Sequence, residues 1–281
     1  MRRFYNRLER RDYLIKHISY SYLHLLACPF AAFLRYEAGI KAPMNEYLAL
    51  GNALHKALED GHKAASFEGS YVHSVFTKEF NRIITDDEVF VGYPQKKKLE
   101  AAGAAMLALY TGQIKSGSIS STPYKIEEGF KIPYKNIVIV GRIDKVEFDQ
   151  ARGYDIIDYK SGSREPDPWF LRHNLQLTAY AWACQELYGE LPRKVIWHHL
   201  RNGKRLETDR TQQDIDQLKK MIDAALKMEQ HKIRYRVFHE KICEWCDYAG
   251  EGKECEDYDI EERILNAKKP RAVGVDSDRK D

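Results

Sequence analysis

The sequence predicts an α/β fold, with helices in the first half of the chain and a β-sheet in the second. Between residues 19 and 115, apolar side chains recur at helical spacing between capping residues and prolines. Between residues 124 and 208, runs of β-branched and aromatic residues alternate with turn residues, with one helical run among them. The length of 281 residues and the hydrophobic content of 43% provide for one large core or two modest ones.

Capping residues and prolines set the expected helix boundaries in the first half. Ser19 and Asn45 are suitable N-cap residues, and Pro29 can begin one helix after ending the preceding one. Residues 1–16 are heavily charged and are expected to form a frayed helix or a tail. The expected helices span residues 20–26, 30–37, 46–65, 70–84 and 95–115. A loop rich in Ser and Gly follows at residues 116–122.

Turn residues divide the second half into strands. Lys135-Asn136, residues 149–153 and Asn202-Gly203 have turn composition, and Asn-Gly is a strong hairpin signal. The expected strands span residues 124–134, 137–148, 154–160, 194–200 and 206–208. One helix, from Trp169 to Tyr188, is expected between the strands, and an amphipathic helix that opens at Thr211 or Asp214 and runs to about Gln230 follows them.

The expected hairpin of residues 137–160 carries charges where strands disfavour them. Asp144 lies inside its first strand, and Asp158 and Lys160 close its second, on one face. Two carboxylates on neighbouring strands repel each other unless a hard divalent cation binds them. An adjacent ammonium can then orient water or stabilise developing charge. The alternative is a surface hairpin whose Asp and Lys pair with each other, and the Asp-x-Lys triplet alone favours that alternative.

Further polar residues shift the balance toward a metal site. Gln176 and Tyr180 are four residues apart and therefore lie on one helix face. His55 is available as a neutral imidazole ligand on the helix that follows Asn45. Among the other charges, we interpret Glu59 as a residue behind the ligands, Arg142 as a phosphate contact, and Glu128 and Glu147 as ordinary strand charges.

Four motifs in one order resemble the RecB-like branch of the PD-(D/E)XK nucleases. They are Gly51-Asn52-Ala53-Leu54-His55, Gly141-Arg142-Ile143-Asp144, Asp158-Tyr159-Lys160-Ser161-Gly162 and Gln176-x-x-x-Tyr180. The resemblance implies a mixed β-sheet flanked by helices, with an N-terminal helical insertion. It implies Mg²⁺ or Mn²⁺ held by three side chains and one backbone carbonyl, those of His55, Asp144, Asp158 and Tyr159. The implied catalytic residues are Asp144, Asp158, Lys160, Gln176 and Tyr180, of which the last two orient Lys160 or grip DNA.

The five cysteines indicate a second metal group. Cys243 and Cys246 form a Cys-x-x-Cys pair, and the sequence shows no secretory signal, so grouped thiols in a reducing cytoplasm favour metal over disulfides. Some RecB-like nucleases, including the AddB nuclease domain and CRISPR-associated exonucleases, have one cysteine before the core and three after it. This resemblance implies a [4Fe–4S] cluster on Cys28, Cys243, Cys246 and Cys255, although the last gap is longer than usual. Zn²⁺ is the alternative, and Cys184 is interpreted as a buried apolar residue.

Charge and composition limit the function. The net charge of +3 is small for a nucleic-acid binder, so a DNA-binding surface must be local, and Lys96-Lys97-Lys98 is one candidate. No phosphate-binding Gly-x-x-x-x-Gly-Lys-[Ser/Thr] motif and no long apolar segment are present. The resemblance therefore implies a cytoplasmic, metal-dependent exonuclease on single-stranded DNA ends, which works beside other proteins of CRISPR adaptation, recombination or repair. The alternative is a DNA-end-binding adaptor that does not cleave.

The expected organisation has five parts. An N-terminal segment with the first cluster cysteine covers residues 1–44, and a helical region with the metal-ligand histidine covers residues 45–122. The nuclease core covers residues 123–231, and the cysteine module covers residues 232–260. Residues 261–281 are charged, contain proline and are expected to be a disordered tail.

Overall fold

The structure, a computed structural model, describes residues 16–87, 89, 91–231, 233, 235–237, 243–244, 246–249 and 255. The expected charged segment before residue 16 and the expected tail at residues 261–281 lie outside the described residues. Its helices are α2 (Tyr20–Leu25), α3 (Pro29–Tyr36), α4 (Glu46–Lys63), α5 (Gly69–Asp86), α6 (Tyr93–Lys115), α7 (Pro168–His173), α8 (Leu175–Tyr188) and α9 (Gln212–Gln230). Its strands are β1 (His17–Ile18), β2 (Lys125–Tyr134), β3 (Ile137–Asp149), β4 (Gly153–Lys160), β5 (Lys194–His199) and β6 (Lys204–Thr208).

The strands form one mixed sheet in the order β1-β3-β4-β5-β6, and β2 also pairs with β3. β3 is antiparallel to β2 and β4, β4 is parallel to β5, and β5 is antiparallel to β6. The parallel pair is connected through α7 and α8, as a crossover requires. The mixed α/β fold that the sequence predicts is therefore confirmed.

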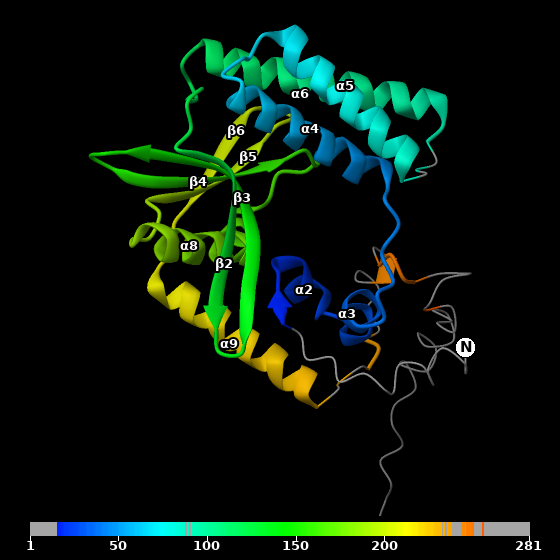
Figure 1. Ribbon diagram of the computed structural model, residues 1–281, viewed down its shortest axis with the longest axis vertical. Helices are drawn as coiled ribbons and strands as arrows, with labels where there is room; N and C mark the ends of the chain where they lie inside the picture. Colours follow the sequence, from blue (N-terminus) through cyan, green and yellow to red (C-terminus); the bar gives the residue numbers. More distant parts are fainter. Residues whose placement is uncertain are drawn as a thin grey trace, which may run out of the picture.

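Helices cover both faces of the sheet (Figure 1). The alternation along β4 shows why: Ile156 belongs to the core that α8 and α9 cover, whereas Ile157 and Tyr159 belong to the core that α4, α5 and α6 cover. α4 contributes an apolar stripe to the second core, consisting of Ala49, Leu50, Ala53, Leu54, Ala57 and Leu58. The helical layer is thus fixed on the strand that carries Asp158 and Lys160.

A third, smaller core joins segments that are far apart in the sequence. Phe30, Ala31 and Leu34 of α3 pack against Tyr248 and Cys255 near the C-terminal end. Figure 1 shows α3 (blue) beside this C-terminal segment (orange). The Tyr248 hydroxyl donates a hydrogen bond of 2.9 Å to the carbonyl oxygen of Ile40. The two ends of the nuclease-like core are therefore held together by direct contacts.

Two predicted elements differ from the structure. The single helix expected from Trp169 to Tyr188 is two helices, because Asn174 has an extended backbone and its side chain caps α8 at the Leu177 amide. The buried Arg210 guanidinium donates to the Leu171 and Asn174 carbonyls, so the break leaves these groups hydrogen-bonded. Strand β1, which pairs in parallel with residues 138 and 139 of β3, was not expected.

Candidate active site

His55 projects from α4 toward the sheet and is held in one orientation by the backbone of β4. Its Nε2 atom lies 3.2 Å from the carbonyl oxygen of Tyr159. A carbonyl oxygen only accepts hydrogen bonds, so Nε2 carries a proton and donates it. The other ring nitrogen, Nδ1, faces two carboxylates, at 3.5 Å from Asp144 Oδ1 and 3.9 Å from Glu127 Oε1. In the neutral ring, the Nδ1 lone pair therefore points between these two carboxylates.

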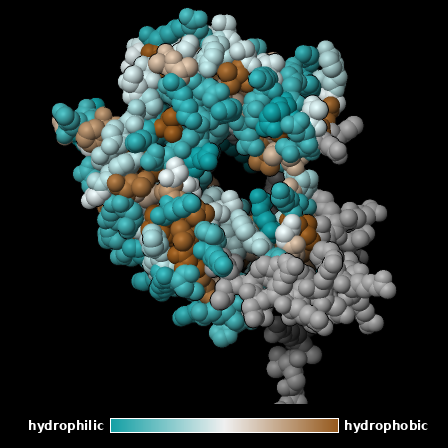
Figure 2. Space-filling model, viewed as in Figure 1, coloured by the Kyte–Doolittle hydropathy of each residue, from teal (hydrophilic) through white to brown (hydrophobic). Residues whose placement is uncertain are grey.

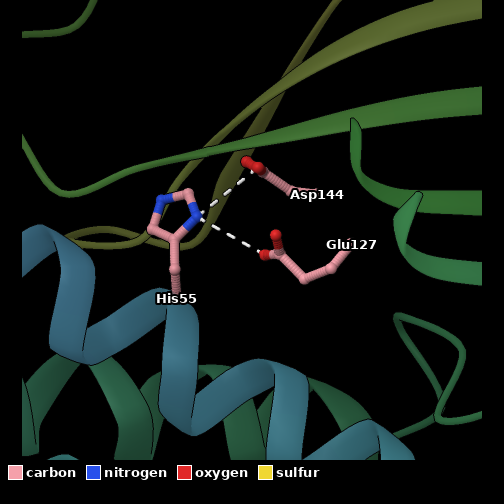
Figure 3. A group of neighbouring side chains, drawn as sticks. All are labelled: His55, Glu127 and Asp144. Atoms are coloured by element: carbon pink, nitrogen blue, oxygen red, sulfur yellow. Dashed lines mark ion pairs between the residues drawn. The ribbon is translucent and has the colours of Figure 1, made fainter. Parts of the chain in front are cut away.

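Asp144 and Glu127 come from neighbouring strands that place them opposite each other. The β2–β3 register pairs Ile126 with Lys145 and Glu128 with Ile143, so Glu127 lies across from Asp144. Glu127 has a φ of 50°, a left-handed conformation that costs energy for any residue other than glycine. The ligand atoms of His55, Glu127 and Asp144 all lie within 4.8 Å of one another. Figure 3 shows the imidazole and both carboxylates converging from the helix and the two strands.

The electrostatics of this group are those of a cation site. Burial disfavours the charged imidazolium, yet the Asp144 and Glu127 carboxylates raise the pKa of His55 to about 10. Asp144 also accepts a 2.7 Å hydrogen bond at Oδ2 from the Tyr159 amide, which fixes its rotamer. Negative charge is thus concentrated between the Asp144 and Glu127 carboxylates, and a positive charge at that point stabilises the two carboxylates.

Asp158 and Lys160 lie beside this group and contact each other. Asp158 is 1% exposed, and burial raises the pKa of its carboxyl group. Its Oδ2 atom lies 2.7 Å from Lys160 Nζ, but within the described residues neither of its oxygens accepts a hydrogen bond of good geometry. Asp158 is therefore a buried carboxylate with coordination capacity to spare.

α8 supplies the residues that orient Lys160. The ammonium group of Lys160 donates a 3.0 Å hydrogen bond to Gln176 Oε1, and Gln176 Nε2 donates a 2.8 Å bond to the hydroxyl of Tyr180. Burial opposes the charged form, yet the Asp158 carboxylate raises the pKa of Lys160. The structure thus brings together all five side chains of the expected catalytic set, with Tyr180 acting through Gln176.

His55, Glu127 and Lys160 of this group line a cavity of about 490 Å³ between α4 and the sheet. It is lined by Tyr47, Leu48, Gly51, Asn52, His55, Lys56, Glu59, Glu127, Arg142, Tyr159, Lys160, Ser161 and Gly162. Figure 2 shows an opening in this face of the molecule below the helical layer. Three cations, Lys56, Arg142 and Lys160, line the cavity together with the acidic group. This combination suits a substrate whose anionic group must approach a cation held by carboxylates.

Comparison with known proteins identifies the family. The sequence profile of the PD-(D/E)XK nuclease superfamily matches residues 17–250. The chain belongs to the PD-(D/E)XK nuclease superfamily. No curated protein is significantly similar to this nuclease in sequence.

One solved structure shares the fold of this PD-(D/E)XK nuclease, and a second matches it more weakly. A candidate exonuclease from Eubacterium rectale is similar over 90% of this chain and 94% of its own, with a TM-score of 0.56 and 14% sequence identity. The crystal structure of SSO0001 is similar over 87% of this chain and 91% of its own, with a TM-score of 0.40 and 12% identity. Membership of the family makes the protein a metal-dependent nuclease.

The residues present fit the divalent cation that this nuclease family uses. The donors are one imidazole nitrogen and carboxylate oxygens, which suit Mg²⁺ or Mn²⁺. The two carboxylate oxygens of Asp158 that accept no hydrogen bond add acceptor capacity nearby. The Tyr159 carbonyl, expected as a ligand, lies 3.2 Å from His55 Nε2, where it also fixes the orientation of the imidazole.

Sequence reasoning about this PD-(D/E)XK nuclease missed Glu127. Its neighbour Glu128 was considered and Glu127 was not, because the two differ only in register. The two-residue turn Lys135-Asn136 pairs Tyr134 with Ile137, and counting back from it places Glu127 opposite Asp144. The two-residue turn was therefore the signal in the sequence from which the position of Glu127 could have been found.

The other charges singled out in the sequence take distinct positions. Glu59 forms ion pairs with Lys56 and Lys63 at the cavity wall. Arg142 is exposed, lines the cavity and lies 3.7 Å from Glu127. Glu147, interpreted as an ordinary strand charge, is instead partly buried between Lys145 and Arg205, which lower its pKa to about 2 against the effect of burial. None of the described helices of this nuclease is long and apolar enough to cross a bilayer.

The four cysteines expected to hold a cluster line one small cavity in this nuclease. Cys28, Cys243, Cys246 and Cys255 come together there beside Arg236. The Val237 amide donates a hydrogen bond to Cys28 Sγ at 3.5 Å. Burial raises the pKa of Cys246 and of Cys255. Cys184 is fully buried in the main core, away from this group, as its apolar surroundings in the sequence indicated.

Proposed function

We propose that this protein is a divalent-metal-dependent exonuclease that hydrolyses phosphodiester bonds at single-stranded DNA ends. The observation that carries the proposal is the convergence of His55, Glu127 and Asp144 beside an oriented, charged Lys160 in an open cavity. A purely DNA-binding adaptor has no need of a cation site next to a buried lysine.

Each side chain has a role in the proposed hydrolysis. Bound Mg²⁺ or Mn²⁺ supplies Lewis-acid activation of the phosphate and of the attacking water. Asp144, Glu127 and His55 Nδ1 hold the cation, and Asp158 offers its unbonded oxygens to it. Lys160, fixed by Gln176, orients the water or stabilises charge that develops on phosphate oxygens. Asp158 keeps Lys160 protonated for this task.

The shape of the cavity supports a single-stranded substrate. A volume of about 490 Å³ is that of a pocket for a small ligand or for one to two nucleotides. α4 forms one wall of this cavity, and an unpaired strand is narrower than a duplex, so the size of the cavity favours an unpaired end at Lys160.

We further propose that Cys28, Cys243, Cys246 and Cys255 hold a [4Fe–4S] cluster. The four cysteines line one small cavity, and the order of one cysteine before the core and three after it supports the cluster over zinc. Reduced thiols and the motif resemblance support a cytoplasmic role in CRISPR adaptation, recombination or repair, beside other proteins of those pathways.

The test is a cleavage assay on protein purified without oxygen. Single-stranded DNA labelled at either the 5′ or the 3′ end is incubated with Mn²⁺, beside Asp158→Ala and Lys160→Ala. We expect cleavage by the unaltered protein, loss in both variants, and iron with broad absorbance near ~400 nm. The label that is released first gives the polarity.

Three other outcomes change the proposal in different ways. A colourless, zinc-containing protein that cleaves replaces the cluster with Zn²⁺. Cleavage inside a circular strand removes the exonuclease assignment. Binding of DNA without cleavage under Mg²⁺ or Mn²⁺ leaves the adaptor in place of the enzyme.

A further inference from the structure

Two apolar side chains stand exposed on the wall of the active-site cavity. Tyr47 is 58% exposed and Leu48 is 51% exposed, and both line the cavity that contains His55 and Lys160. Single exposed apolar residues are common on protein surfaces. An adjacent aromatic and aliphatic pair on the wall of a substrate cavity is different, because it lies in the same cavity as His55 and Lys160, within reach of a bound polymer.

The pair belongs to one continuous stripe of α4. The residues of α4 that line the cavity recur at the spacing of one helix face, and they are Tyr47, Leu48, Gly51, Asn52, His55, Lys56 and Glu59. From Tyr47 to His55 the helix rises about 12 Å, at roughly 1.5 Å for each of eight residues. Gly51 lies between them without a side chain, and a Cβ atom there would lie 3.3 Å from Ser161 Oγ. The Ser161 side chain therefore packs closely against α4 at Gly51, between Tyr47 and His55, and the stripe continues on either side of it.

The Tyr47 side chain is held in place before any ligand binds. Its backbone amide donates a 3.0 Å hydrogen bond to the capping residue Asn45, which fixes the first turn of α4. Its hydroxyl accepts a 3.2 Å hydrogen bond from Gln95 of α6. An aromatic ring anchored at both ends loses little conformational entropy when a flat group stacks on it.

The charge around the pair identifies the occupant as a nucleic-acid strand. The lysine run Lys96-Lys97-Lys98 follows Gln95, the hydrogen-bond partner of the Tyr47 hydroxyl, in the first turns of α6. Lys56, Arg142 and Lys160 line the same cavity further along. Cations that track a backbone, interleaved with an aromatic face, are the features of single-strand binding sites.

We propose that Tyr47 and Leu48 form a stacking platform for an unpaired nucleobase of the strand being cleaved. This inference rests on the proposed nuclease function and adds a contact that selects single strands. About 12 Å of helix corresponds to roughly three nucleotides of a stacked strand, or fewer of an extended one. In a duplex, the faces of the bases are covered by their neighbours, so the platform contacts only unpaired bases.

Kinetics on two substrates test the platform separately from the chemistry. The substrates are an oligothymidylate and the p-nitrophenyl ester of thymidine 5′-monophosphate, which is too short to reach Tyr47 from the metal group. We expect Tyr47→Ala to raise KM for the oligonucleotide about tenfold, within the range of one lost base stack. Its kcat and KM for the small ester are expected to stay unchanged. Tyr47→Phe keeps the ring and is expected to restore most of the oligonucleotide KM.

Tyr71→Ala is the matched control, since Tyr71 is a partly exposed tyrosine on α5 outside the cavity lining. Unchanged oligonucleotide KM in Tyr47→Ala, or an equal loss on both substrates, overturns the platform. Anisotropy of a labelled oligothymidylate without a divalent metal measures binding alone. If the unaltered protein cleaves neither substrate, the nuclease proposal fails, and a binding loss limited to Tyr47→Ala still supports the platform. A binding loss shared by Tyr71→Ala overturns it.

Discussion

Glu127 combines a position set by strand register with a left-handed backbone angle. The β2–β3 register places Glu127 opposite Asp144, on the face toward His55, and its φ of 50° departs from the regular antiparallel conformation. The left-handed conformation at a glutamate costs about 1 kcal/mol or more. Such strain persists where the surrounding hydrogen bonds hold it, and here the β2–β3 ladder continues on both sides.

Removing the charge of Glu127 is expected to weaken metal binding without unfolding the protein. In Glu127→Gln, the side chain keeps its size and loses its full negative charge. We expect the Mn²⁺ concentration for half-maximal activity to rise at least about tenfold. Manganese titration of the cleavage rate measures this. Glu128→Gln, one residue along and outside the ligand group, is the control, and an equal effect in both variants would contradict the assignment of Glu127.

Two buried histidines make stability depend on pH. Burial lowers the pKa of His62 to about 4 and that of His198 to about 3, assisted by Lys145 and Arg205 respectively. Below about pH 6.5, these two histidines bind protons in the unfolded chain but stay neutral in the folded protein. The contribution of these two histidines to the unfolding free energy is therefore fully present above that pH and is lost as the pH falls toward 4. At pH 5 the loss is about 2 kcal/mol per histidine.

Urea unfolding at pH 8, 7, 6 and 5 measures this dependence. We expect the two buried histidines to lower the unfolding free energy below about pH 6.5, and His55, whose pKa is raised to about 10, to lower it as the pH rises from 7 to 8. His62→Gln should reduce the decline by roughly half, since one of the two histidines is removed. A decline that is unchanged in this variant would assign the acid sensitivity to other groups.

Helix α4 is attached to β4 through one residue, Tyr159, at two points. His55 binds the backbone carbonyl of Tyr159 directly. Two turns along the helix, His62 lies 3.0 Å from the Ser121 carbonyl through Nδ1 and 2.7 Å from the Tyr110 hydroxyl through Nε2. The carbonyl can only accept, so Nδ1 donates and Nε2 accepts from Tyr110, which in turn accepts from the Tyr159 hydroxyl at 2.7 Å.

Tyr110→Phe interrupts this chain and tests whether it positions α4. The variant leaves the Tyr159 hydroxyl and His62 Nε2 without partners, so we expect a loss of about 1–3 kcal/mol in unfolding free energy. We also expect weaker Mn²⁺ binding, because His55 moves with α4. Tyr188→Phe is the control, since the Tyr188 hydroxyl is buried and has no hydrogen-bond partner in the described residues. Equal metal affinity in both variants would show that the chain is structural only.

Most elements could be predicted because their signals are local. Ser19, Asn45 and Thr211 cap their helices in the structure as the sequence indicated. The break at Asn174 could not be predicted, because it depends on Arg210, which lies thirty-six residues further along the chain. Strand β1 is only two residues long and gains its partner from β3, more than a hundred residues away.

The site could be predicted in part for the same reason. Asp158 and Lys160 are adjacent in sequence, and Asp144 is joined to them by one hairpin, so pattern and spacing were enough to group them. His55 came only from resemblance, because nothing local shows that α4 packs over β4. A prediction of Glu127 from the sequence would have required both the register of β2 and the unusual φ of this residue. No residue preference encodes that angle for a glutamate.

At the scale of the whole molecule, the thiol group joins the two ends of the core. The peptide amide of Phe30 donates to the Tyr235 carbonyl, and the Val237 amide donates to Cys28 Sγ. These contacts close a loop of more than two hundred residues that contains strands β2 to β6. Closing so long a loop costs chain entropy on folding, and the contacts at its base offset that cost.

Cys28→Ser is expected to remove the metal of the thiol group and lower the melting temperature. Among the described residues, Cys28 is the only thiol through which residues 28–34 contact the C-terminal cysteines. Its replacement therefore opens that attachment. We expect iron content to fall to near zero and Tm to fall by several degrees. Cys184→Ala is the control, because it removes a buried thiol outside the group. It should lower Tm modestly and retain the metal, and metal loss in both variants would contradict the ligand assignment.

The attachment of α3 to the C-terminal segment also determines how the protein responds to mechanical force. A pull on the C-terminal end reaches the contacts of residues 235–255 with Cys28, Phe30 and Ile40 before it reaches any strand, whereas a pull on the N-terminal end reaches β1 first. In the first case the sheet carries no load until those contacts rupture, and their lifetime under force, set by an unfolding rate, governs the process. An unfoldase that threads the chain from the C-terminal end would therefore pause at the thiol group, and the length of that pause would report whether a metal is bound there.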